Sequence, residues 1–402
     1  MARARRPSVS LILSYIFDWV IIIALAGAGG GLNFIQPYMR PFSLLDLDIS
    51  YPYIPNQIIT VGTLVLVSLV APAFVVAFVT AFFVPGWHFA KARGWSKKKI
   101  LMAKLWELEK GWAGLALSCA GAFFVTQAAK NMFGKPRPDF LDRCQPDLGN
   151  LQRYIVGGYG QDISARWTLV TSAICTTTDQ ALIRDGFRSF PSGHSSFSWA
   201  GLLYLTLFLC AKLNIAIPYL PLQPEPSDAL ERRKKMDLEL LPMHNRGPSN
   251  EIDNRKSEDA MLSTQLHGTE GPLKRDGRLH PSNIKDLAAA PPNYLLIVAF
   301  FPVGVAFYIC STRYVQYWHH GFDIIFGALI GILTAWFSFR WYHLPLSRGQ
   351  GWAWGARSSN RAWGIGVGTG GYVDREDVLR RREAGRNGGS GNGAVPTGEN
   401  AV

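Results

Sequence analysis

Residues 58–84 read IITVGTLVLVSLVAPAFVVAFVTAFFV and contain no charged side chain. An apolar run of about 18 residues or more is long enough to cross the hydrocarbon core of a bilayer as a helix. Because core helices of soluble proteins are seldom apolar on every face, such runs favour membrane spans over buried helices of a large soluble protein. Five further runs reach or approach this length, at residues 11–32, 112–129, 195–217, 294–310 and 324–341. The predicted fold class is an all-α, polytopic membrane protein with six spans.

The distribution of basic residues predicts the orientation of these spans. Arg3, Arg5 and Arg6 precede the first run, and six Lys or Arg residues but no acid lie in residues 85–104. Positively charged connections stay in the cytoplasm, so the N-terminus and this second connection are expected there. We therefore attribute the net charge of +12 to the orientation of the spans in the membrane and not to nucleic-acid binding. The first run is too long for a signal peptide, which predicts a retained span.

Composition divides the chain into three regions. Residues 1–57 form an N-terminal segment with the first span, residues 58–342 form the membrane domain, and residues 343–402 form a basic, Gly-rich tail that is expected to be mobile. Residues 218–292 interrupt the membrane domain with Pro, Glu, Lys and Ser and few aromatic side chains. Such a stretch buries too little apolar surface to fold, so it predicts a disordered cytoplasmic insertion.

Two of the five cysteines, Cys144 and Cys175, fall in the long connection between spans three and four. The alternation of spans places this connection on the non-cytoplasmic, oxidising side, where disulfides form. A disulfide and two unpaired thiols are both compatible with the sequence. The other three cysteines lie within spans and are expected to be packing residues.

Basic and histidine residues gather at the ends of four spans. Lys130 and Arg137 follow the third span, Ser192, Gly193 and His194 precede the fourth, and Arg313, His319 and Asp323 lie between the fifth and the sixth. Spans four and five cross the membrane twice and return the chain to the same side. All three clusters are therefore expected together on the non-cytoplasmic face, at the depth of lipid head groups.

The residue types in these clusters match the needs of phosphoryl transfer. His319 and Asp323 are four residues apart, so on a helix the carboxylate would hold the imidazole ready to attack phosphorus. His319 is thus the candidate nucleophile and Asp323 its orienting residue, with a phosphohistidine as the expected intermediate. His194, at the start of a span, is the candidate general acid that protonates the leaving oxygen.

The remaining cluster residues are candidate phosphate ligands. Lys130, Arg137 and Arg313 supply positive charge, and the Ser192 hydroxyl and Gly193 amide lie at a helix N-terminus, where anions bind. With three fixed cations no metal or other cofactor is expected. Two neighbouring residues also carry ionisable side chains. The simpler interpretation is that Lys135 is a solvated lysine and His320 an interfacial histidine, so no role is expected for them.

These residues resemble the three motifs of the lipid phosphate phosphatase branch of the type 2 phosphatidic acid phosphatase superfamily. The family patterns are Lys-x6-Arg-Pro, Pro-Ser-Gly-His and Ser-Arg-x5-His-x3-Asp, and this chain departs only at Thr312, where Ser is usual. The resemblance covers about residues 58–342. It implies a six-helix bundle of the kind also found in vanadium haloperoxidases, and a magnesium-independent phosphatase.

Residues 135–144, KPRPDFLDRC, are similar to the fungal diacylglycerol pyrophosphate phosphatase group. That resemblance implies phosphatidate, diacylglycerol pyrophosphate and lysophosphatidate as substrates, with a lipid bilayer as the site of action and no nucleic-acid partner. The motifs contact phosphate and not the lipid tail, so sphingoid base phosphates and isoprenoid diphosphates are alternatives. A non-catalytic scaffold or transporter with an anion site is a further one. The vacuolar, endoplasmic reticulum and plasma membranes are all compatible with the sequence.

Overall fold

The structure is a computed structural model. It describes residues 9–86, 90–91, 94–164, 167–213, 215, 292–346, 351–355, 357 and 363. The predicted insertion at 218–292, except Pro292, and most of the predicted tail at 343–402 lie outside the described residues. The chain divides into two units, Ile22–Trp354 and the paired ends Met1–Ile21 with Gly355–Val402.

Six helices are long and apolar enough to cross a membrane, as predicted. They are α1 (Val9–Leu32), α2 and α3 (Val61–Val65 and Ala71–Phe83, joined by a π-helical turn at Leu66–Val70), α5 (Lys97–Phe133), α9 (Gly193–Lys212), α13 (Asn293–Val315) and α14 (Gly321–Tyr342). The third is much longer than its apolar run, because Ser96 caps its start by accepting a hydrogen bond from the Lys99 amide. Residues 97–104, which the apolar runs left in the second connection, thus belong to this helix.

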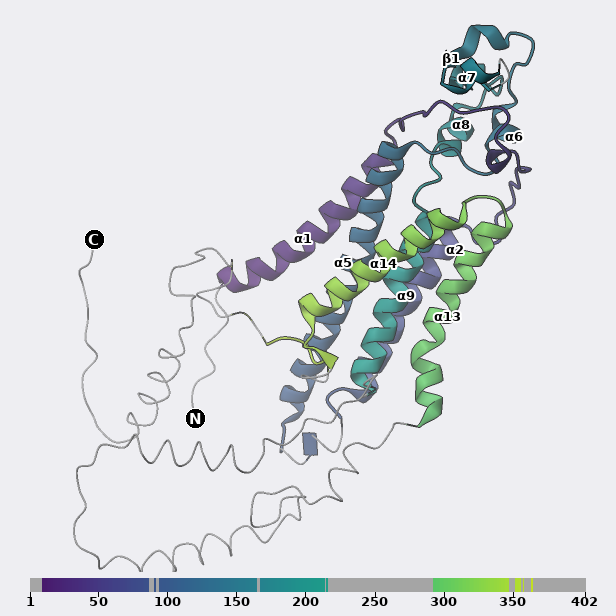
Figure 1. The fold of residues 1–402 in the computed structure, drawn as a ribbon. Helices are drawn as coiled ribbons and strands as arrows, with labels where there is room; N and C mark the ends of the chain where they lie inside the picture. Colours follow the sequence, from purple (N-terminus) through teal and green to yellow (C-terminus); the bar gives the residue numbers. More distant parts are fainter. Residues whose placement is uncertain are drawn as a thin grey trace, which may run out of the picture. The chain divides into compact units, whose positions relative to one another are not determined.

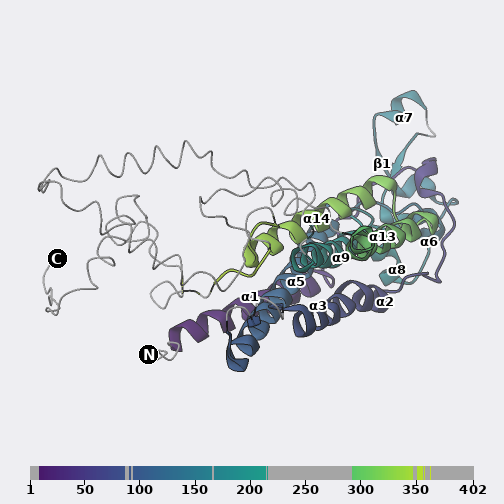
Figure 2. The ribbon, with the colours of Figure 1, turned by 90° about the horizontal axis from the view of Figure 1, so that it is seen from below.

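Helix α9 forms the centre of the larger unit. It packs against α14, α13, α5 and α3, and these helices surround it in both views (Figures 1 and 2). Its side chains Tyr204 and Phe208 are fully buried in a core that also includes Val76, Leu115 and Phe339. The helix that carries His194 is the most buried of the six candidate spans.

Two glycines allow α14 to lie directly against the start of α9. A Cβ atom on Gly331 would overlap the carbonyl oxygen of Ser196, and one on Gly327 would crowd that of Ser192. Small residues four apart on a helix permit such close backbone approach between membrane helices. The close packing brings the N-termini of both helices together, and the Ser192 amide donates to the Asp323 carbonyl at 2.9 Å.

The connections 33–60 and 134–192 fold together at one end of the bundle (Figure 1). They contain the short helices α6 (Phe140–Cys144), α7 (Gly160–Ile163) and α8 (Gln180–Gly186), the 3₁₀ turns Leu47–Ile49, Leu151–Tyr154 and Ser172–Ile174, and two antiparallel strands, β1 (Ile155–Gly157) and β2 (Leu169–Val170). Phe42, Phe140, Val170 and Phe187 are among the side chains of their shared core. We call this small domain the cap.

A disulfide joins Cys144 to Cys175 within the cap. Of the two alternatives that the sequence allowed, the structure forms the disulfide. Cys119, Cys210 and Cys310 are buried free thiols in the spans, as expected. The cross-link ties α6, which follows the Arg137 loop, to the segment that leads into α8.

In the smaller unit, Arg357 and Trp363 contact the start of α1. The Arg357 guanidinium forms a 2.6 Å ion pair with Asp18, and the Trp363 ring packs on Phe17. Part of the predicted C-terminal tail is thus in contact with the predicted N-terminal segment.

Candidate active site

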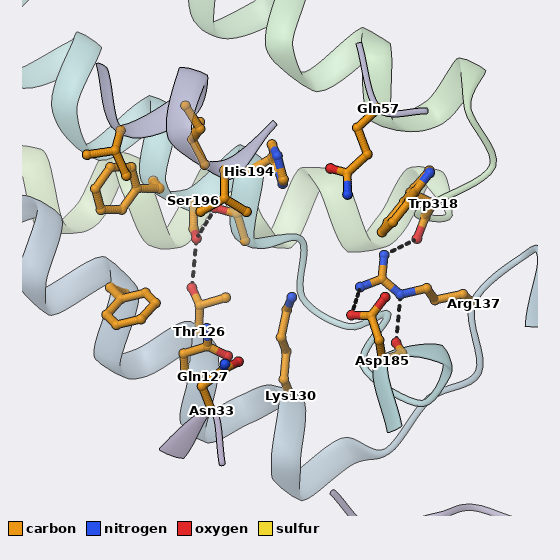
Figure 3. Close-up of a pocket in the computed structure, with 16 residues that line it drawn as sticks. Asn33, Gln57, Thr126, Gln127, Lys130, Arg137, Asp185, His194, Ser196 and Trp318 are labelled. Carbon is orange, nitrogen blue, oxygen red and sulfur yellow. Dashed lines mark hydrogen bonds and ion pairs between the residues drawn. The ribbon is translucent and has the colours of Figure 1, made fainter. Parts of the chain in front are cut away.

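The end of α5 places Lys130. The helix ends at Gly134, whose φ of +54° suits glycine and whose amide donates to the Lys130 carbonyl. Lys130 lies in the last turn and extends toward the start of α9 (Figure 3). A Cβ atom on Gly193 would lie 3.4 Å from Lys130 Nζ, so the missing side chain at 193 leaves room for this ammonium group.

Arg137 is held in a fixed orientation by a carboxylate and an aromatic ring. Its Nη2 donates to Asp185 Oδ1 at 2.7 Å and its Nε to the Asp185 carbonyl at 2.8 Å. Its Nη1 donates to the Trp318 carbonyl at 3.2 Å, and its guanidinium lies 4.8 Å from the Trp318 ring centroid. Asp185 was not a candidate from the sequence, because it lies 48 residues from Arg137.

Asp185 belongs to a chain of charges that continues into the cap. Arg143 donates to Asp185 Oδ2 at 2.9 Å and to Asp139 Oδ2 at 2.7 Å, and both Arg143 and Asp139 are fully buried. Desolvation, the largest influence, raises the pKa of Asp185, but the positive charges of Arg137, Arg143 and Lys130 outweigh it and hold that pKa below its ordinary value. The PRPDFLDR stretch at 136–143 is the one sequence signal for this network, as part of the resemblance to the fungal group.

Ser192, Gly193 and His194 open α9, as predicted. The Ser192 hydroxyl is buried and, among the described residues, has no hydrogen-bond partner. His194 Nε2 contacts the Ile59 carbonyl at 3.0 Å. Because a carbonyl only accepts, this nitrogen carries the proton in the contact.

His319 is buried and neutral. Its Nδ1 donates to the Ser189 carbonyl at 2.7 Å, which fixes the tautomer and leaves Nε2 as the free nitrogen. Burial and then the nearby charges of Arg137 and Lys130 hold the pKa of His319 well below its usual value. A neutral imidazole with an unprotonated Nε2 is the form that a nucleophile requires.

Asp323 differs from its expected arrangement. The sequence argument placed His319 and Asp323 on one helix face, but α14 begins at Gly321, so His319 lies before the helix. The Asp323 carboxylate instead accepts from the His320 amide at 3.2 Å and from the Ser189 hydroxyl, as part of a capping box. Ser189 therefore connects the two residues, since its hydroxyl donates to Asp323 while its carbonyl accepts from His319.

Lys135 and His320, for which the sequence predicts no role, also contact Asp323. Lys135 forms a 3.0 Å ion pair with Asp323 Oδ1, and His320 Nδ1 lies 3.1 Å from Oδ2. His320 Nε2 in turn lies 3.2 Å from the Asp48 carbonyl. The end of α5 brings Lys135 to this buried carboxylate, and the short loop before α14 brings His320, although the Lys135 side chain remains 37% exposed.

Arg313 is fully buried behind the site. Its Nη1 donates to Gln57 Oε1 at 3.0 Å and its Nη2 to Gln316 Oε1 at 2.9 Å. Its Nε donates to the Thr312 hydroxyl at 3.3 Å, so the hydroxyl that Thr shares with the expected Ser is used. Gln57 and Gln316 were not candidates from the sequence, since one lies 256 residues away and the other in a loop.

A cavity of about 340 Å³ joins several of these residues (Figure 3). It is lined by Lys130, Arg137, Asp185, His194 and Gln57. The cavity is also lined by apolar side chains from α2, α5 and α9, namely Val61, Leu64, Val65, Phe123 and Phe197, and by the polar residues Asn33, Thr126, Gln127 and Ser196. A cavity lined by both cationic and apolar side chains fits a molecule with an anionic head and a hydrocarbon chain.

The eight predicted site residues do not all line this cavity. Lys130, Arg137, Gly193 and His194 line it, whereas Ser192, Arg313 and Asp323 are buried behind it. His319 lines a second cavity of about 230 Å³, which Tyr51, Tyr314 and Tyr317 also border. Among the described residues, no group of three His, Cys, Asp or Glu side chains is arranged to hold a metal ion.

Comparison with known proteins relates this site to a family. Residues 111–223 and 260–345 match the PAP2 superfamily. The chain carries a PAP2 superfamily domain. All eight predicted site residues lie within the PAP2 match, whereas α1, α2, α3 and the connection that carries Gln57 precede it.

Three curated relatives illustrate the similarity. The chain is 35% identical over 188 residues to diacylglycerol pyrophosphate phosphatase 1 of Saccharomyces cerevisiae. This alignment covers 46% of this chain and 55% of that protein. It is 31% identical over 208 residues to a probable diacylglycerol pyrophosphate phosphatase 1 of Schizosaccharomyces pombe, covering 52% of this chain and 63% of that one. Lipid phosphate phosphatase 2 of Arabidopsis thaliana is 24% identical over 351 residues, 87% of this chain and 84% of the relative.

The alignments with the two fungal relatives thus span between half and two thirds of their lengths. None of the solved structures gives a significant match to this chain. The PAP2 domain and the six apolar helices together make this a multi-pass membrane protein.

Proposed function

We propose that this protein is a magnesium-independent lipid phosphate phosphatase that hydrolyses phosphatidate, diacylglycerol pyrophosphate and related lipids. The observation that carries the proposal is the cavity lined both by Lys130, Arg137 and His194 and by apolar side chains of α2 and α5. A phosphate would bind beside Lys130 and Arg137 while its acyl chain lies against Val61, Leu64 and Phe123. The printed names of the fungal and plant relatives support the same substrate class.

The first chemical step would be attack by His319. The lone pair on Nε2 forms the N–P bond as the P–O bond to the leaving group breaks, giving a phosphohistidine and a free lipid hydroxyl or lipid monophosphate. The contact of Nδ1 with the Ser189 carbonyl supports this role, because it directs Nε2 away from that backbone. Lys130 and Arg137 would stabilise the charge on the transferring phosphoryl group.

His194 would protonate the leaving oxygen. In this proposal His194 acts as an imidazolium: its Nε2 proton, which points at the Ile59 carbonyl in the structure, passes to the leaving oxygen and leaves a neutral imidazole. In the second step, water attacks phosphorus, the N–P bond breaks, and His194 accepts the proton from water. Inorganic phosphate is released, and His319 returns to its neutral form.

The reaction would take place on the non-cytoplasmic face of the membrane. The cap lies at the end of the bundle that carries the site, and its Cys144–Cys175 disulfide suits an oxidising compartment. The positive residues in 85–104 lead into α5 at the opposite end, which suits the cytoplasm.

The decisive experiment uses purified protein in detergent micelles. Wild-type protein is expected to release phosphate from dioctanoyl phosphatidate and from diacylglycerol pyrophosphate in EDTA, and His319→Ala is expected to lose that activity while unfolding at a similar temperature. Acid-quenched protein should carry an acid-labile phosphoryl group only when His319 is present. Absence of phosphate release from both lipids would favour a non-catalytic anion-binding protein, and dependence on added Mg²⁺ would contradict the metal-independent mechanism.

A further inference from the structure

Helix α5 presents an apolar, a neutral polar and a cationic side chain in order along one wall of the cavity. Phe123, Gln127 and Lys130 are three or four residues apart on this helix and all line the cavity, so they share one helix face. At a rise of about 1.5 Å per residue, Gln127 lies about 4.5 Å and Phe123 about 10.5 Å from Lys130 along the axis. A lipid with its terminal phosphate at Lys130 and its chain at Phe123 therefore places the group between them beside Gln127.

Arg188, in the segment between α8 and α9, fixes which way the Gln127 amide faces. Its Nη2 donates to Gln127 Oε1 at 2.7 Å, and because a guanidinium only donates, the amide nitrogen is turned away from it. Its Nη1 donates to the Asn33 backbone carbonyl at 2.9 Å, while the Asn33 residue lines the same cavity. Among the described residues, neither Gln127 Nε2 nor the Asn33 carboxamide forms a hydrogen bond. Figure 3 shows Asn33 and Gln127 on one side of Lys130 and Arg137 on the other.

Arg188 is also a buried positive charge that forms no ion pair within the part of the chain that the structure describes. Arg137 and Arg143 both pair with Asp185, whereas the hydrogen bonds of Arg188 go to neutral oxygens. A buried charge without a counter-ion is costly, and an anion in the adjacent cavity would supply the missing charge. Because Lys130 and Arg137 already serve the transferring phosphoryl group in the proposed mechanism, Arg188 is available to a second anionic group.

We propose that Arg188, Gln127 and Asn33 form a subsite for the second phosphate of a lipid diphosphate. The terminal phosphate binds beside Lys130, and the phosphate attached to the lipid accepts a hydrogen bond from Gln127 Nε2 while the charge of Arg188 stabilises it from behind. Lipid diphosphates are then better substrates than lipid monophosphates, because a monophosphate places an uncharged glycerol group in the subsite. This inference rests on the proposed function, and its three residues lie outside the three motifs.

The test compares two lipids with identical chains in the same purified variants. Dioctanoylglycerol pyrophosphate and dioctanoyl phosphatidate differ only in the second phosphate, so the ratio of their kcat/KM values reports on the subsite and does not depend on the amount of folded protein. Gln127→Glu places a carboxylate against Arg188 and a negative charge in the subsite. It should lower the ratio of diphosphate to monophosphate about 10- to 100-fold, as expected for the loss of a hydrogen bond to a charged group. The KM for phosphatidate should change little.

Two further variants separate the amide from the general shape of the cavity. Gln127→Met keeps the length of the side chain and removes the amide without adding charge, and it should lower the same ratio about tenfold. Thr126→Val is the matched control, because Thr126 lines the same cavity but its hydroxyl already donates to the Ser196 hydroxyl at 2.7 Å. This variant should affect the two lipids alike and leave their ratio unchanged.

Binding without turnover is measured by thermal unfolding in the presence of inorganic phosphate or inorganic pyrophosphate. A ligand that binds the folded state raises the unfolding temperature whether or not it is hydrolysed. Pyrophosphate can occupy both phosphate positions, so in wild-type protein it should give a larger shift than phosphate at the same concentration. Gln127→Glu should remove this difference.

Three results would overturn the inference. Equal losses for both lipids in Gln127→Glu would mean that this position holds the glycerol group that they share. A ratio that falls as far in Thr126→Val as in Gln127→Met would mean that the shape of the cavity discriminates, and not the amide. Equal thermal shifts by phosphate and pyrophosphate in wild-type protein would exclude a second phosphate position. Failure of the proposed function looks different, since wild-type protein would then hydrolyse neither lipid, yet the larger shift by pyrophosphate and its loss in Gln127→Glu would remain.

Discussion

Single residues in this site depend on partners from distant parts of the chain. His319 is oriented by the carbonyl of Ser189, Arg137 by the side chain of Asp185, and Arg313 by Gln57. Each of these partners lies outside the motif of the residue that it holds. The motif residues therefore identify the chemistry, and partners from elsewhere in the chain fix the orientation of each motif side chain.

The buried, neutral state of His319 has a consequence for stability. In the unfolded chain a histidine titrates near its usual value, whereas burial and the charges of Arg137 and Lys130 hold the pKa of His319 well below it in the folded state. Below that usual value the unfolded state binds a proton that the folded state does not. Stability is then lost as the pH falls, by about 1.4 kcal/mol per pH unit for one proton.

We expect His319→Asn to reduce this loss. The Asn amide can still donate to the Ser189 carbonyl but does not titrate. The unfolding temperature of both proteins is measured at about pH 7.5 and about pH 5, and the decrease should be smaller in the variant. Equal decreases would contradict a neutral, buried His319.

Ser189 should act as a positioning residue for His319. Ser189→Ala removes the hydroxyl that donates to Asp323 but keeps the carbonyl that accepts from His319. Because a hydrogen bond to a buried carboxylate contributes about 1.5–3 kcal/mol and the loss is partly relieved by Lys135 and His320, we expect kcat to fall about tenfold. The KM for phosphatidate should change little.

Ser189→Thr is the matched control, because it retains a hydroxyl at the same position. It should recover most of kcat if its hydroxyl reaches Asp323. A kcat for Ser189→Ala equal to that of wild type would show that Asp323 holds the loop without Ser189.

At the scale of helices, the site depends on the contact between α14 and α9. Gly327 and Gly331 allow their backbones to approach, so that Ser192 at the start of α9 meets Asp323 in the first turn of α14. Helix α5 contributes from a third side through Lys130 in its last turn. The ends of α5 and α9 thus line the cavity with Lys130 and His194, while the start of α14 supports α9 from behind.

A larger side chain at 331 should separate these helices. We expect Gly331→Leu to lower stability by about 1–3 kcal/mol through overpacking, and to lower phosphatase activity in the protein that still folds. Gly304→Leu in α13 is the matched control, because a Cβ atom there meets nothing within 4 Å. The unfolding temperature in detergent measures both. Equal effects at 304 and 331 would mean that glycine itself, and not the α9–α14 contact, matters.

At the scale of the molecule, the cap and the bundle contribute different parts of the site. The bundle supplies Lys130, His194 and the apolar wall, and the cap supplies Arg137 and Asp185. Residues 54–59 of the cap also touch the bundle residues Arg313, Trp318 and His194. Loosening the cap should therefore affect catalysis as well as stability.

The disulfide offers a direct test of the cap. Denatured protein should react with a maleimide at three cysteines without reductant and at all five after reduction. The double variant Cys144→Ser with Cys175→Ser should lose about 3 kcal/mol of stability, because a cross-link between residues 31 apart restricts the unfolded chain. Labelling of five cysteines without reductant would contradict the disulfide.

The orientation of the molecule can be tested with introduced cysteines. Tyr159 in the cap is 83% exposed, and Lys98 near the start of α5 is also exposed. In sealed vesicles or intact cells, a membrane-impermeant maleimide on the non-cytoplasmic side should label Tyr159→Cys and spare Lys98→Cys. The reverse pattern would place the site on the cytoplasmic face.

The six spans and the motif residues can be predicted from the sequence, but the contacts of the motif residues cannot. Long apolar runs and fixed motif spacings are local properties, so they can be read without a structure. The expected pair of His319 and Asp323 failed because it assumed that the helix included His319, and a helix start depends on its capping contacts. Asp185, Ser189 and Gln57 gave no local signal, since their partners are 48, 130 and 256 residues away.

The sequence by itself determined two properties of this protein. Its long apolar runs require a membrane, and the cations and histidines at the ends of these runs suit a phosphate ligand. Tertiary packing decided how those groups work together. It buried His319 and turned its free nitrogen away from the Ser189 carbonyl, gave Asp185 to Arg137, and placed Gln127 against Arg188. The reason is that hydrogen-bond direction and desolvation depend on neighbours in space, which a linear pattern does not specify.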